Sequence, residues 1–150
     1  MVPLSGKGPG AMRHKPIRIT IGLLAAFIAL TAGGGGIAIL TGIDPFPPEW
    51  LEGTPFRTYT IPALLLSIAV GGSSLLAAVM VFTGRPRDLI AALAAGLIMA
   101  GYIAVEVLIL NDGTGPTPIE YFYLGLGLAM AALAGYLWIA EDRPRREQAA

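Results

Sequence analysis

The sequence predicts an all-α fold: an integral membrane four-helix bundle with both termini in the cytoplasm. Of its 150 residues, 55% are hydrophobic and 13% are charged, whereas a typical soluble domain carries about 25% charged residues. So few charges cannot cover the surface of a soluble globule of this length. Four long apolar runs and a one-sided distribution of basic residues point to the same class.

Each of the four apolar runs is long enough to cross a bilayer, since about 20 helical residues span a hydrocarbon core of roughly 30 Å. The runs lack the alternation of barrel strands and are rich in Leu, Ala, Ile and Gly, which favours helices. They lie at about 17–43, 60–82, 89–110 and 119–140. We therefore expect a transmembrane domain over 17–140, flanked by a disordered basic tail at 1–16 and a cytoplasmic tail at 141–150, disordered after Pro144.

The basic residues set the predicted orientation. Every Lys and Arg except Arg57 precedes the first run or lies at its very start, lies between the second and third, or follows the fourth. By the positive-inside rule, both termini and the 83–88 turn face the cytoplasm, while 44–59 and 111–118 face outward.

The chemistry that the chain lacks excludes several classes of function. It has no cysteine, and its one histidine, His14, precedes the first run. Disulfide, thiolate, bis-histidine haem and Ser-His-acid chemistry therefore lack their parts. A formal net charge of zero argues against a nucleic-acid partner. We expect a non-enzymatic protein with no metal or cofactor, whose surroundings are the lipid bilayer.

Four consecutive glycines, Gly33, Gly34, Gly35 and Gly36, lie within the first run. Each costs about 1 kcal/mol relative to alanine in a soluble helix, so some gain must offset them. One interpretation is a hinge or an unwound stretch that lines a cavity or binds an ion, as in transporters. The other is close packing against a neighbouring helix.

Small residues also recur at every fourth position in the last two runs. They are Ala92, Gly96, Ala100 and Ala104 in the third, and Gly127, Ala131 and Gly135 in the fourth. Each row predicts a smooth helix face where backbones approach closely. Such faces serve either packing within the bundle or an interface with a second copy or another membrane protein.

Glu106 is the one acid well inside an apolar run, and ionisable residues within a membrane are candidates for function. It lies about one helical turn from the end of its run, at a depth similar to that of Arg57. Three roles stay open. Glu106 forms an ion pair with Arg57, couples a proton or substrate with Tyr102 as hydrogen-bond donor, or reaches the outer headgroups.

The first outer loop, residues 44–59, reads DPFPPEWLEGTPFRTY. Its prolines prevent a long helix, and its aromatic side chains are too apolar for a solvated loop. We expect it to lie at the membrane interface, with one short turn from Pro48 to Gly53. The alternative is a lid over the outer mouth of the bundle.

The stretch EWLEGTPFRTYTIPALLL, followed by GGSSLLAAV, a short basic turn and an acid-bearing third run, resembles a group of small four-span bacterial membrane proteins of unknown function. The resemblance covers about residues 17–140 and is most specific over 49–66. It implies four helices in the bacterial cytoplasmic (inner) membrane and carries over no site residue. We expect an accessory or oligomeric structural component of that membrane; the alternative is a small transporter or channel that uses Glu106 and residues 33–36.

Overall fold

The computed structural model describes residues 14–109 and 115–149, and within these ranges the chain is helical, with no strand. Four helical segments are long and apolar enough to span a membrane: Lys15–Thr41, Thr60–Thr83, Asp88–Ile109 and Pro118–Arg143. Every predicted boundary lies within three residues of these limits. The all-helical, four-span part of the prediction is therefore confirmed.

The elements follow one another in a simple order along the chain. They are α2 (Lys15–Thr41), the one-turn 3₁₀-helix η1 (Pro48–Leu51), then α3 (Thr60–Leu64), the π-helix η2 (Leu65–Gly72) and α4 (Ser73–Thr83), then α5 (Asp88–Ile109) and α6 (Pro118–Ala149). The segment formed by α3, η2 and α4 is the second span and runs without a break.

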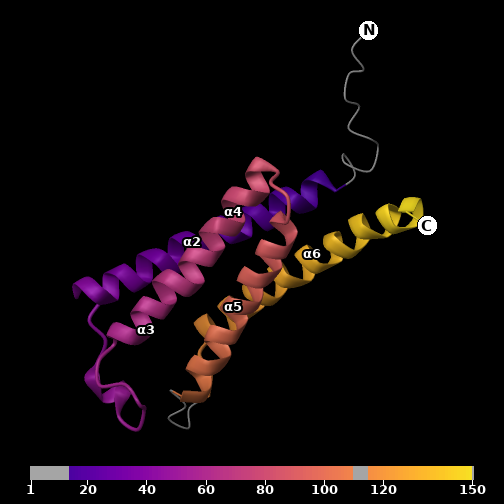
Figure 1. Ribbon diagram of the computed structural model, residues 1–150. Coiled ribbons are helices and arrows are strands. Elements are labelled where there is room, and N and C mark those ends of the chain that lie inside the picture. The colour runs from indigo at the N-terminus through magenta and orange to yellow at the C-terminus, as the bar shows by residue number, and fades with distance from the viewer. Residues whose placement is uncertain (1–13, 110–114, 150) are drawn as a thin grey trace.

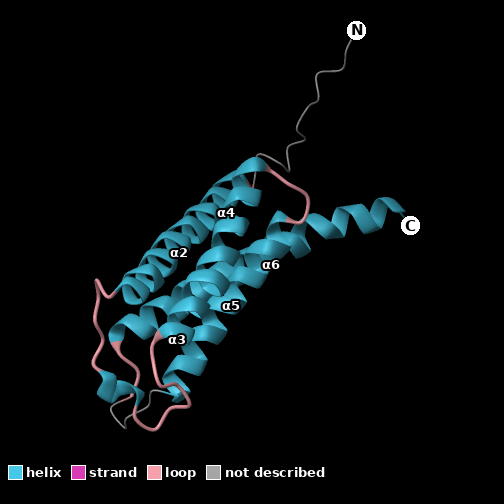
Figure 2. Ribbon diagram, turned by 60° about the vertical axis from the view of Figure 1, so that its left-hand side comes forward, coloured by secondary structure: helices cyan, strands magenta, loops and turns pink. Residues whose placement is uncertain are grey.

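The spans alternate in direction and pack as two hairpins (Figures 1 and 2). The first hairpin joins α2 to the second span, the second joins α5 to α6, and contacts of α4 with α5 and of α2 with α6 hold the two together. Figure 1 shows the start of α2 and the end of α6 at one end of the bundle, here the termini end. The loop that carries η1 lies at the opposite end, here the loop end.

The interior consists of branched aliphatic, methionine and small side chains, and the exterior is apolar as well. Fully buried residues include Ile21, Ile28, Met99, Met130 and Leu137, whereas large apolar side chains stay exposed along every span, with Leu30 at 77% and Leu108 at 78%. An apolar surface around the spans is what a helical bundle needs in lipid, where no water solvates the outside. The architecture is compatible with a multi-pass membrane protein.

The helix ends follow from local chemistry. Pro16 lies in the first turn of α2, where the missing amide hydrogen costs nothing. Gly42 and Gly84 end α2 and α4 in the left-handed conformation, at φ of 73° and 63°, which glycine adopts without strain. The predicted tail at 1–16 is thus too long by two residues, because α2 begins at Lys15; residues 1–13 lie outside the described part.

The end of α6 also corrects the sequence analysis. The tail after Pro144 was expected to be disordered, yet the helix continues to Ala149. Proline removes one helical hydrogen bond, but an i, i+4 ion pair spans the site: Arg146 Nε lies 2.7 Å from an Asp142 carboxylate oxygen. Such pairs stabilise an exposed helix by a few tenths of a kcal/mol.

Candidate functional site

The predicted ion pair between Glu106 and Arg57 is not formed. Glu106 is half-buried on α5, Arg57 is exposed in the loop before α3, and no ion pair joins these two described residues. Tyr102 does not serve as a donor to Glu106 either, since its hydroxyl donates to the backbone carbonyl of Pro62 at 3.3 Å. Tyr102 therefore links α5 to the start of the second span.

The glycine run lies on an unbroken helix, and Gly36 is the member of the run that packs most closely against the second span. At Gly36, an added Cβ would lie 1.9 Å from Ser67 Oγ and 2.7 Å from the carbonyl oxygen of Ala63. At Gly34, an added Cβ would meet no atom within 4 Å. Because α2 is helical through all four glycines, the structure favours the packing interpretation over an unwound segment.

The element that faces the glycine run is itself irregular. The π-helix η2 (Leu65–Gly72) lies against α2, and a Cβ added at Gly71 would lie 3.0 Å from the backbone nitrogen of Gly33. Backbone thus meets backbone at this crossing. Short π-helical stretches within α-helices are rare and frequent at functional sites, and nothing in the apolar sequence of the second span predicts one.

Serines line the same segment. Ser67 Oγ donates to the carbonyl of Ala63 at 2.9 Å, and Ser73 Oγ to that of Val70 at 3.2 Å, as expected for serines in apolar helices. Ser74 Oγ is fully buried and has no hydrogen-bond partner among the described residues. The hydroxyl groups of Ser67 and Ser73 are therefore satisfied within their own helix.

A second close crossing joins α5 and α6. A Cβ added at Gly96 would lie 2.6 Å from the carbonyl oxygen of Gly127 and 2.7 Å from the backbone nitrogen of Ala131. Ala92, Ala100 and Ala131 are buried along the same faces, whereas Ala104 is exposed. The rows of small residues thus pack inside the bundle over most of their length.

Charged side chains meet at the termini end, in a cluster that the sequence analysis did not identify. Arg18 of α2 forms ion pairs with Asp88 of α5 and with Glu141 of α6, the latter at 2.7 Å. The Asp88 side chain is only 8% exposed, and its second oxygen accepts the amide hydrogen of Leu89 at 2.7 Å. One guanidinium therefore ties three helices together.

The local signals for this cluster were present but weak. Asp88 opens the third apolar run and Glu141 closes the fourth, so both acids stand where basic residues dominate. Arg18 was assigned only to the orientation signal. A carboxylate at the same level as a cluster of cations is the one feature that could have indicated a pair.

At the loop end, aromatic side chains gather around the predicted turn. Phe46 lies 5.7 Å from Trp50 and 5.6 Å from Tyr59 between ring centroids, and the Tyr59 hydroxyl donates to the carbonyl of Pro47 at 2.7 Å. Burial, and then the charge of Glu49, raise the pKa of Tyr59. The one-turn helix and Gly53 at φ 83° confirm the short turn predicted from Pro48.

In the part of the chain that the structure describes, no group of three or more His, Asp or Glu side chains lies close enough together to hold a metal ion. Comparison of the chain with protein families, curated proteins and solved structures finds no match. Evidence on function therefore comes from the sequence and from the geometry of the bundle.

Proposed function

We propose that this chain is a multi-pass protein of the bacterial cytoplasmic membrane that acts as a non-enzymatic accessory or oligomeric structural component. The observation that supports the proposal most is the contact of backbone with backbone at two crossings inside the bundle. Gly36 meets the second span, and Gly96 meets Gly127. Helices that approach so closely leave no room between them for a substrate path, and small residues at crossings are the usual basis of stable membrane bundles.

The transporter alternative uses Glu106 and the glycine run. Because the run lies in a continuous helix and Gly36 packs on the second span, the geometry supports the packing interpretation of these glycines. Glu106 remains as a proton- or substrate-coupling candidate, half-buried in an apolar span. An intramembrane carboxylate keeps that candidate worth testing.

The location of the termini is part of the same proposal. The start of α2 and the end of α6 share one end of the bundle (Figure 1), and the described basic residues of α2, of α6 and of the link between α4 and α5 lie at that end, whereas Arg57 lies in the loop before α3. Positive charge marks the cytoplasmic side of short loops and tails. The resemblance to small four-span bacterial proteins supports the same membrane.

Two measurements test the proposal. In proteoliposomes that contain a pH-sensitive dye, the wild-type protein should produce no proton flux above empty vesicles, and Glu106→Gln should behave identically. Flux that requires Glu106 would establish the transporter alternative. In parallel, the protein extracted from its own membrane within a polymer-bounded lipid disc should be found with a second copy or with another protein. A strictly monomeric chain without an associated protein would overturn the accessory role.

A further inference from the structure

Helix α6 extends beyond the apolar span that it forms. The span ends at Arg143, whereas the helix runs to Ala149, and Figure 1 shows its last turns, in yellow, projecting past the other helices. Around this transition, five side chains line a surface pocket of about 360 Å³. They are Trp138, Ile139, Asp142, Arg143 and Arg146.

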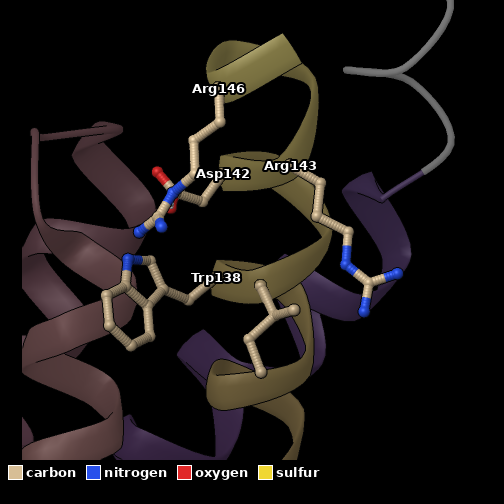
Figure 3. A pocket seen from close by; sticks show the side chains of 5 residues that line it. Trp138, Asp142, Arg143 and Arg146 are labelled. Carbon is tan, nitrogen blue, oxygen red and sulfur yellow. Dashed lines mark hydrogen bonds and ion pairs between the residues drawn. The ribbon is translucent and has the colours of Figure 1, made fainter.

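The side chains that line the pocket change from apolar to charged along the axis of α6. Trp138 and Ile139 lie on the side of the span, and Asp142, Arg143 and Arg146 follow within the next two turns. Figure 3 shows Trp138, Asp142 and Arg146 on one side of α6 and Arg143 on the other, so the two arginines form opposite walls. At 1.5 Å per residue, the pocket extends about 12 Å along the helix, which is close to the depth of a headgroup region.

The pocket keeps a net positive charge. Asp142 pairs with Arg146 through Nε at 2.7 Å, and the Arg146 side chain is 82% exposed, which leaves its terminal amino groups open. Among the described residues, no ion pair engages Arg143. Arg18 differs from both, because two carboxylates already hold its guanidinium.

We propose that this pocket binds the headgroup of an anionic glycerophospholipid, with the negative charge of its phosphate attracted by Arg143 and Arg146 from either side of α6 and its first acyl carbons against Trp138 and Ile139. Arginine recognises phosphate oxygens through several hydrogen bonds, and tryptophan prefers the interface between chains and headgroups. The Asp142 carboxylate accepts hydrogen bonds from headgroup hydroxyls, so phosphatidylglycerol is the best match. Basic pockets beside membrane helices bind anionic lipids in this way.

The inference rests on the proposed membrane insertion, and the chain offers its own reporter for both. It contains two tryptophans, one at each end of the bundle. In Trp50→Phe, Trp138 is the sole tryptophan, its emission can be excited selectively over that of the tyrosines, and lipids brominated on their acyl chains quench it on contact. In phosphatidylcholine vesicles, brominated phosphatidylglycerol should quench Trp138 more strongly than brominated phosphatidylcholine does. In the reciprocal variant Trp138→Phe, Trp50 should show no such preference.

Arg143→Gln and Arg146→Gln, each made in the Trp50→Phe background, should lower the preference for phosphatidylglycerol by roughly fivefold each. Arg57→Gln, at the other end of the bundle, is the matched control and should leave the preference unchanged. Equal quenching by the two lipids, or a preference that survives both arginine substitutions, would overturn the lipid site while leaving the membrane placement intact. Trp138 that neither lipid quenches would overturn the placement as well.

Discussion

The sharpest consequence of the packed glycine run is that two neighbouring glycines respond oppositely to the same substitution. Gly34→Ala adds a methyl group where no atom lies within 4 Å. Gly36→Ala adds one 1.9 Å from Ser67 Oγ and 2.7 Å from the carbonyl oxygen of Ala63. The serine hydroxyl could move, but the carbonyl belongs to a helix backbone, so the two helices would have to separate.

The size of the packing penalty follows from the difference in the free energy of unfolding between the two variants. Both substitutions gain the same backbone preference for a helix, up to about 1 kcal/mol, so their difference isolates the packing penalty. Forcing an extra methyl group into a filled site costs about 1–3 kcal/mol. We therefore expect Gly34→Ala to be neutral or stabilising, and Gly36→Ala to be less stable than Gly34→Ala by about 1–3 kcal/mol.

The assay is reversible unfolding in mixed micelles, with helicity followed against the mole fraction of denaturing detergent. Gly36→Ala combined with Ser67→Ala should recover part of the loss, because the double variant removes one of the two close atoms. Equal stabilities of Gly34→Ala and Gly36→Ala would refute the packing argument. Such a result would return the glycine run to the hinge interpretation.

Three further predictions use the same unfolding assay or simple labelling. Arg18→Gln should lower the free energy of unfolding by about 1–3 kcal/mol. This loss is smaller than for a fully buried pair because the Arg18 side chain is partly exposed. A loss of stability smaller than that of Arg57→Gln would refute the three-helix tie. Arg57→Gln and Glu106→Gln should be additive within about 0.5 kcal/mol, since the two residues do not pair; a larger coupling in the double-mutant cycle would restore the ion pair. In intact spheroplasts, an impermeant maleimide should label Thr54→Cys and leave Gln148→Cys unlabelled, and the reverse pattern would invert the proposed topology.

The four spans could be predicted because their signal is local. A window of about 20 apolar residues carries its own evidence of a membrane helix, and turn-forming residues such as Gly42 and Gly84 mark the ends. The faces of small residues were predictable for the same reason, since spacing by four places them on one side of a helix. Which helix each face meets was not predictable.

The sequence carries only a weak local signal for the charged tie and none for the π-helix. Arg18 lies 70 residues from Asp88 and 123 residues from Glu141, so only the folded arrangement brings them together. The pairing of Arg57 with Glu106 was wrong for a related reason: it compared depths along helices, but Arg57 lies in a loop whose path the aromatic cluster determines. Depth fixes one coordinate of a side chain and leaves its direction around the helix open.

The π-helix η2 sets how α4 is rotated about its axis relative to α3. Hydrogen bonds in η2 reach one residue further than in an α-helix. A π turn therefore accommodates about one residue more than an α turn, and if η2 returned to the α pattern with all its residues in place, α4 would turn by about 100° about its axis. Ser74, Ala77 and Val81, now buried, would then rotate away from the interior, and larger side chains would turn inward. The π pattern between Leu64 and Ser73 thus sets the rotation of α4 relative to α3.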